Sequence, residues 1–123
     1  MTTQEVANQL VNYCRQGQYE KAQEELYADH AVSIEPKGAQ GPERTEGIAG
    51  IKAKGEQWAA MVEEIHGAEI TDPIVAANFF SCAMRNDITF KGQGRMTIEE
   101  VCVYEVDNGK IVKEQFFFPV APM

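Results

Sequence analysis

Glu35 is the residue whose position in this sequence best suits proton-transfer chemistry. It ends a mostly apolar segment, Ala31–Glu35, and Pro36 follows it. Apolar surroundings disfavour the charged form of a carboxyl group, so its pKa rises towards neutrality and it becomes a usable proton acceptor. The alternative is a hydrated carboxylate at the end of a strand, or the partner of an Arg or Lys side chain. We therefore take Glu35 as the first candidate for a general base.

Tyr13 and His66 are the next candidates for catalytic side chains. Tyr13 falls in an amphipathic helical pattern, where a tyrosine can donate a hydrogen bond or simply pack in the core. His66 begins a predicted strand, and near Glu35 it would act as a proton shuttle. A single histidine in such a place is more often a hydrogen-bonded wall residue. His30 follows Asp29 in a predicted turn, and we expect it at the surface.

Other kinds of reactive site find no support in the sequence. The two histidines are far apart, and no Cys or Asp stands beside them at metal-ligand spacing. Gly92 and Gly94 belong to a hairpin turn rather than a phosphate-binding loop, because no strand–loop–helix pattern surrounds them. A Gly-x-Ser-x-Gly motif is missing, and the cysteines have no base at a recognisable spacing. We expect neither a metal nor a cofactor.

The composition is typical of a single soluble domain that spans residues 1–123. Hydrophobic residues make up 44% of the chain and charged residues 24%, which favours a folded core over disorder. The net charge of −8 disfavours nucleic acid and anionic membranes as partners, since phosphate binding needs a basic surface. No stretch approaches the roughly 18 apolar residues that a membrane span requires.

The cysteines and the N-terminus indicate a cytoplasmic protein. Cys14, Cys82 and Cys102 are odd in number, widely spaced and surrounded by apolar residues, which predicts buried free thiols in a reducing compartment. The segment MTTQEVANQL has neither the basic region nor the apolar run of a signal peptide.

The first half of the chain is predicted to be mainly helical. Thr2 and Glu5 fit a capping box at the start of a first helix, and Gly17 marks its end. A second helix is expected over Gln18–Tyr27 and a strand over Ala31–Glu35. A surface loop at 37–47 and a third helix over Ile48–Val62 follow.

From Ile65 onward the pattern becomes typical of β-strands. The expected strands are Ile65–Thr71, Ile74–Phe90 with a bulge near Asn78, Arg95–Val106 and Lys110–Phe118. Asn108-Gly109 is a hairpin turn between the last two. Helices first and a long antiparallel meander afterwards predict an α+β fold rather than an α/β fold.

Three stretches of the sequence carry a resemblance to a known family. Residues 26–36, LYADHAVSIEP, join the second helix to the first strand; Gly47 with Ile51 begins the third helix; and residues 96–117 form the last hairpin, with a Gly-Lys-Ile turn. In these stretches the chain resembles the SnoaL-like and ketosteroid-isomerase-like domains of the nuclear transport factor 2-like superfamily. The resemblance implies a cone-shaped, curved mixed β-sheet wrapped around three N-terminal helices, with the ligand site inside the cone.

The resemblance also implies a hydrogen-bond donor on the first helix. Ketosteroid isomerases carry there a tyrosine that stabilises a developing oxyanion. Aligned from the start of the helix, Tyr13 matches it; aligned back from Gly17, Leu10 does. Tyr19 and Tyr27 are alternatives.

Acidic residues of the family's site have two counterparts in this chain. Glu35 matches the general base of ketosteroid isomerases, where an acidic residue also precedes a proline. A second acid lies in their penultimate strand, and an ungapped count back from Gly109 puts Val101 at its position. Side chains alternate along a strand, so Glu99 shares the face of Val101 and is predicted to take this role. Glu100 would face a partner or solvent, although a register slip of one residue exchanges the two.

Strand alternation and the resemblance together predict the pocket wall. Met84, Asn86 and Ile88 share one face, which matches the cavity-lining face of the relatives, and Asn86 would orient a ligand carbonyl or hydroxyl. Other expected wall residues are Trp58, Met61, Val101, Phe116 and Phe118. The alternative is that the apolar members fill the core.

The run Phe116-Phe117-Phe118 predicts a homodimer. It must place apolar rings on both faces of the last strand. A sheet with two apolar faces has both covered, here one by the helices and the other by a partner chain. The outer sheet face is also a common dimer surface in the superfamily.

Two classes of function fit these expectations. The first is a cofactor-independent isomerase, cyclase or dehydratase that transfers protons on a small apolar substrate, and it predicts Glu35 facing a hollow of ligand size. The second is a non-catalytic ligand-binding protein or a dimeric interaction module. Ligand binding predicts that a cation such as Lys54 or Arg95 neutralises Glu35, and a module predicts a filled cone with an exposed apolar sheet.

Overall fold

Helices lead the chain and a long antiparallel meander ends it. The computed structural model describes residues 1–120, so residues 121–123 of the predicted domain lie outside the described residues. Within residues 1–120 the elements are α1 (Thr3–Arg15), α2 (Tyr19–Leu26), β1 (Tyr27–Ile34), β2 (Arg44–Glu46), α3 (Ile48–Met61), β3 (Val62–Ile70), β4 (Ile74–Ala76), β5 (Phe79–Phe90), β6 (Gly94–Asp107) and β7 (Lys110–Phe117).

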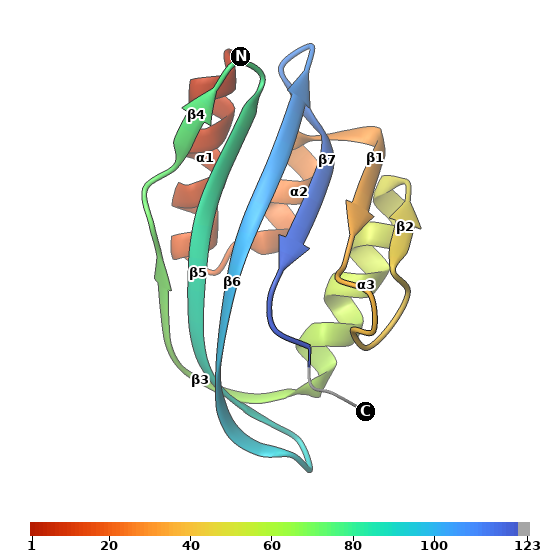
Figure 1. The fold of residues 1–123 in the computed structure, drawn as a ribbon, viewed down its shortest axis with the longest axis vertical. Helices are drawn as coiled ribbons and strands as arrows, with labels where there is room; N and C mark the ends of the chain where they lie inside the picture. The colour runs from red at the N-terminus through yellow and green to blue at the C-terminus, as the bar shows by residue number, and fades with distance from the viewer. Residues whose placement is uncertain (121–123) are drawn as a thin grey trace.

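The strands of residues 1–120 form one mixed sheet of seven strands. Their order is β2-β1-β7-β6-β5-β3, and β4 pairs with β5. Strand β1 runs parallel to β7, and the other pairs are antiparallel. In Figure 1, α1 and α2 lie behind β5, β6 and β7, so one face of the sheet carries helices. We call this the inner face and the opposite one the outer face. The predicted α+β fold, a curved mixed sheet around three helices, is confirmed.

Helix α1 begins where the capping box predicts. The Glu5 amide donates to Thr2 Oγ1 at 3.1 Å, and the Thr2 amide donates to Glu5 Oε1 at 2.9 Å. These two bonds satisfy amide groups that have no partner within the helix. Val6 and Leu10 point into the core, with exposed fractions of 0% and 2%. Gly17 follows the helix with a φ of 72°, a conformation that glycine adopts without strain.

The predicted strand Ile74–Phe90 is instead a hairpin of two strands. Strands β4 and β5 pair with each other, and Ala77 and Asn78 turn the chain between them. Ala77 adopts a φ of 53°, and the Asn78 side chain donates to the Val106 carbonyl at 3.3 Å. The expected bulge near Asn78 is therefore a tight turn. Sequence periodicity missed it because alanine is not a typical residue for a left-handed turn.

Two further boundaries differ from the prediction. Strand β1 begins at Tyr27, which pairs with Ile111, and not at Ala31. The predicted loop 37–47 contains the short strand β2, whose residues are too polar and too few to show a strand period.

Even-numbered residues of β5 and β6 build the core on the inner face. They are Phe80, Cys82, Met84, Ile88, Phe90, Cys102, Tyr104 and Val106, each with an exposed fraction of 9% or less. The rings of Phe80 and Tyr104 stack with centroids 4.7 Å apart. Cys14, Cys82 and Cys102 are buried and form no disulfide, as predicted. The alternation also decides which acidic residues of β6 face inward.

Candidate functional site

Glu35 lies directly after β1 and forms an ion pair with Lys54 of α3. Lys54 Nζ donates to Glu35 Oε1 at 3.0 Å and also donates to Ser33 Oγ. The two charged side chains have exposed fractions of 17% and 22%, so Glu35 does not project into bulk solvent. The ammonium also lies 5.5 Å from the ring centroid of Phe116, close enough for a cation–π contact.

Glu114 extends this polar group deeper into the protein. Strand β1 pairs in parallel with β7, and the register puts Ser33 opposite Glu114. The Tyr27 hydroxyl donates to Glu114 Oε1, and Ser33 is the residue opposite Glu114 on the neighbouring strand. Burial raises the pKa of Glu114, which is only 4% exposed, although its polar neighbours Tyr27 and Ser33 oppose the rise.

Glu100 is the third carboxyl group on this face. It is half-buried on β6, two residues before the buried Cys102. Burial raises the pKa of Glu100 to about 7, and the nearby negative charges of Glu35 and Glu114 add to the rise. We call Tyr27, Ser33, Glu35, Lys54, Glu100 and Glu114 the interior polar cluster.

Replacement of Glu100 by Gln is expected to flatten the pH dependence of stability. The pKa of Glu100 in the folded protein lies above the ordinary value of 4.5, so its contribution to stability is complete below pH 4.5 and is lost as the pH rises through about 7. Between pH 4.5 and about 8.5, the free energy of unfolding should therefore fall by about 3 kcal/mol less in Glu100→Gln than in the wild type. Urea denaturation measures this difference.

Glu99→Gln is the matched control for this titration. Glu99 is a neighbouring glutamate on the outer face, and its variant should follow the wild-type curve. If the free energy of unfolding depended on pH in the same way in Glu100→Gln and in the wild type, burial would not be raising the pKa of Glu100.

Glu99 and Val101 lie on the outer face of the sheet, and not on the inner face where the predicted pocket wall places them. Cys102, Tyr104 and Val106 must face the helices because they fill the core, and alternation then turns Glu100 inward as well. Glu99 lies on the outer face with Arg85, 3.5 Å from its Nε, and Val101 is 46% exposed there. The ungapped count from Gly109 had given the opposite face.

Tyr13 and His66 lie outside the interior polar cluster. The Tyr13 hydroxyl donates to Glu25 at the surface, and Lys21 lies over its ring. Leu10, the alternative in the alignment, is a core residue. His66 Nε2 is 2.7 Å from Thr89 Oγ1, which is on the outer face of β5.

The other ring nitrogen of His66, Nδ1, lies 3.1 Å from Glu64 Oε2. His66 is thus on the opposite side of the sheet from Glu35, and the expectation of a shuttle between them is wrong. Two register shifts in the pairing of β3 with β5, one directly after Ile65, interrupt the regular alternation of side chains along β3.

Most of the predicted wall residues share the inner side of the sheet with the cluster. Met84 and Ile88 are buried, and Asn86 lies half-buried between them on β5. Trp58 is half-buried and meets Phe90 edge to face, with centroids 6.2 Å apart. Phe116 packs against the core, Phe118 is half-buried, and Met61 is 38% exposed at the end of α3.

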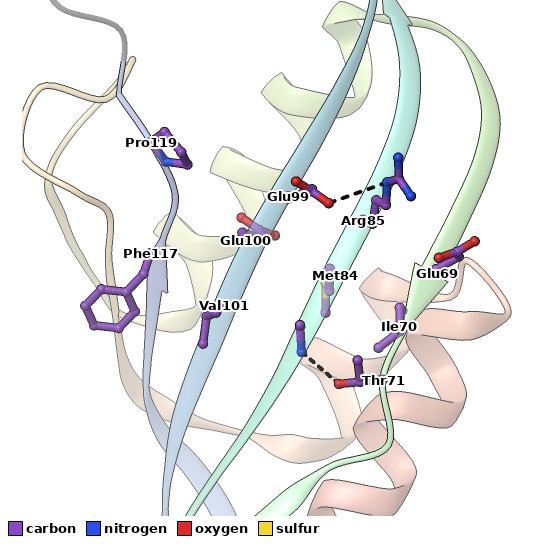
Figure 2. Close-up of a pocket in the computed structure, with 11 residues that line it drawn as sticks. Glu69, Ile70, Thr71, Met84, Arg85, Glu99, Glu100, Val101, Phe117 and Pro119 are labelled. Atoms are coloured by element: carbon purple, nitrogen blue, oxygen red, sulfur yellow. Dashed lines mark hydrogen bonds and ion pairs between the residues drawn. The ribbon is translucent and has the colours of Figure 1, made fainter.

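The hollow that the structure shows at the sheet lies mainly on the outer face. Its volume is about 500 Å³. Figure 2 shows Arg85, Glu99 and Val101 on the side of the strands that faces away from the helices, with Phe117 beside them. Met84 and Glu100 also border the hollow, whereas Glu35 and Lys54 do not. The hollow therefore does not open onto the Glu35–Lys54 pair.

Sequence reasoning missed two members of the interior polar cluster, Ser33 and Glu114. Ser33 and Glu114 are buried polar residues on strands, where a period of two suggests apolar side chains. The sequence did contain one indication that Ser33 belongs with Glu35, because alternation puts Ala31, Ser33 and Glu35 on the same face of the strand.

Within residues 1–120, no three His, Cys, Asp or Glu side chains come together in a way that could hold a metal ion. In the same part of the chain, none of the helices has both the length and the apolar character needed to cross a membrane.

Three N-terminal helices and a seven-stranded mixed sheet with a polar cluster on its inner face define a nuclear transport factor 2-like protein. The SnoaL-like domain family matches residues 1–118. The chain belongs to this family. No curated protein matches the sequence.

Several solved structures are similar to this one. A candidate SnoaL-like polyketide cyclase from Mesorhizobium loti is 32% identical, with a TM-score of 0.88, over 96% of this chain and 100% of that one. A candidate isomerase from Bacillus subtilis is 20% identical, with a TM-score of 0.76, over 97% and 90% of the two chains. TerC, co-crystallised with polyporic acid, is 15% identical, with a TM-score of 0.75, over 95% and 91%. The latter two likenesses show the fold alone.

Proposed function

We propose that this protein binds a small organic molecule at the inner face of its sheet and transfers a proton on it without a cofactor. The observation that carries the proposal is Glu100, a half-buried carboxyl group with a pKa of about 7. A proton acceptor works best when its pKa lies near the pH at which it operates. The name of one similar structure, the candidate SnoaL-like polyketide cyclase that is 32% identical, supports chemistry of this class.

The proposed mechanism divides the work between Glu100 and Lys54. The Glu100 carboxylate takes a proton from a carbon next to a carbonyl group, the electron pair moves onto the carbonyl oxygen, and the same proton is returned at another carbon. The Lys54 ammonium stabilises the negative oxygen, because its charge lies on the inner face and is held in place by Glu35 and Ser33. Asn86 is half-buried on the same face and would orient the ligand.

Proton exchange at carbon tests this mechanism. We expect the wild-type protein to accelerate the exchange of the α-hydrogens of 2-tetralone in D2O, followed by NMR, with a rate that rises through about pH 7. Glu100→Gln should lose at least about 100-fold of this rate. Glu99→Gln should keep it, because that residue faces outward. Equal rates in the two variants would contradict a role for Glu100.

A non-catalytic binding protein is the second candidate function. The observation that favours it is the ion pair itself, since Lys54 neutralises Glu35, the first candidate for the base. Binding of 2-tetralone without any accelerated exchange, seen as NMR shifts of inner-face residues, would support this candidate over the enzyme.

We also propose that a second copy of the chain covers the outer face of the sheet. Val101 and Phe117 are paired neighbours on β6 and β7, and they are 46% and 49% exposed. Four of the charges on this face are paired within one copy, as Arg85 pairs with Glu99 and Arg95 pairs with Asp87. These pairs reduce the repulsion between two such faces, although the whole chain carries a charge of −8.

Location and other partners follow from charge and cysteines. Three buried thiols without a disulfide support a cytoplasmic location, where the compartment keeps thiols reduced. The net charge of −8 argues against nucleic acid and anionic membranes as partners.

A further inference from the structure

Three hydrogen bonds and one strand pairing link the deepest part of the interior polar cluster to Glu35. Tyr27 donates to the Glu114 carboxyl group, Ser33 lies opposite Glu114 in the register of β1 and β7, and Lys54 donates to Ser33 and to Glu35. The participating residues come from β1, β7, α3 and the residue that follows β1. Three elements that are distant in the sequence thus fix the place of one ammonium group.

The direction of these bonds follows from what each group can donate or accept. The Lys54 ammonium can only donate, so the Ser33 oxygen must accept from it. The hydrogen of the Ser33 hydroxyl is then left to donate, and we infer that it donates to Glu114, the residue opposite Ser33 that also accepts from Tyr27. Glu114 is therefore the acceptor that fixes the orientation of Ser33. An apolar side chain at this position would leave the Ser33 and Tyr27 hydrogens without their partner.

We propose that Glu114 is a positioning residue: it holds the Ser33 hydroxyl in the orientation that keeps the Lys54 ammonium against Glu35. The inference deepens the proposed function and rests on it, since Lys54 is the group that meets the negative oxygen there. Glu114 itself does not touch the ligand, because it is 4% exposed beneath Tyr27 and Ser33. The other titratable groups that face it are Cys14, Glu35, Tyr104 and Glu100.

The test follows the hydrogens of the lysine ammonium groups in protein labelled with ¹⁵N-lysine. A hydrogen-bonded ammonium exchanges its hydrogens with water slowly, so the exchange rate reports the bonds of Lys54 directly. Lys54→Arg assigns the signal. We expect Glu114→Met to raise the exchange rate of Lys54 by about tenfold, whereas Glu114→Gln, which keeps an acceptor oxygen, stays within about twofold of the wild type.

Lys52 is the internal control, because its ammonium pairs with Glu24 at 3.2 Å and should not change in these variants. Ser33→Ala removes the acceptor through which Glu114 acts, so it should raise the exchange rate of Lys54, and adding Glu114→Gln or Glu114→Met to Ser33→Ala should raise it no further. Unchanged exchange of Lys54 in Ser33→Ala, or equal exchange in Glu114→Gln and Glu114→Met, would overturn the proposal. The exchange measurement uses no ligand, so it can succeed even if the protein does not catalyse proton transfer. A failure of the positioning proposal is therefore distinguishable from a failure of the proposed function.

Discussion

Lys54→Met is expected to lower the free energy of unfolding by about 3 kcal/mol at about pH 8. The variant leaves Glu35 largely buried without its partner, and an uncompensated buried charge is among the costliest single changes. It also removes a positive charge that favours the ionised forms of Glu100 and Glu114. The loss should shrink towards about pH 5, where these carboxyl groups take up protons. Urea denaturation at the two pH values measures it.

Two variants decide whether the ion pair causes this loss. Lys52→Met breaks an ion pair at the surface, where Glu24 is 53% exposed, and should cost less than about 1 kcal/mol. Lys54→Met combined with Glu35→Gln should recover at least half of the loss, because no charge is then left without a partner. Similar losses for Lys52→Met and Lys54→Met would contradict the role that we assign to the pair.

Phe117→Lys is expected to convert a dimer into a monomer. Phe117 is 49% exposed beside Val101, at the centre of the proposed interface. In a symmetric dimer the introduced ammonium would face its own copy or lie close to it, and it would replace a large apolar contact. We expect the dissociation constant to rise by at least about 100-fold, measured by sedimentation equilibrium.

Met61→Lys is the control for this substitution. Met61 is also apolar and exposed, at 38%, but it ends α3 and lies away from the outer face. Its variant should associate as the wild type does. A wild-type protein that is monomeric at high micromolar concentration, or a Phe117→Lys variant that still dimerises, would exclude this interface.

Local patterns predicted the elements well where the residues that determine a boundary lie close together in the sequence. The capping box of Thr2 and Glu5 places the start of α1 because both partners lie within one turn. Asn108-Gly109 likewise gives the turn between β6 and β7. In contrast, the turn at Ala77 has no typical residue, and only tertiary pairing of β4 with β5 reveals it.

The candidate site was harder to predict because non-local contacts build it. Alternation correctly groups Ser33 with Glu35, and Lys54 was one of two cations expected to neutralise Glu35 in a ligand-binding protein. Glu114, however, joins them through a parallel strand pairing that no pattern in the sequence indicates. The choice between Glu99 and Glu100 depended on the phase of a single strand, and one residue of error reverses it. The buried Cys102, Tyr104 and Val106 settle that phase in the folded protein.

The parallel pairing of β1 with β7 has a consequence for the way the protein folds. Among the strands of residues 1–120, β1 comes first in the sequence, and its neighbour β7 comes last. Lys54 and Glu35 can therefore meet early, but Glu114 joins them only when β7 docks beside β1. Closing such a long loop costs entropy before any contact repays it, so folding should be limited by this docking. Until then the acidic side chains remain hydrated, and the site exists only once β7 has paired with β1.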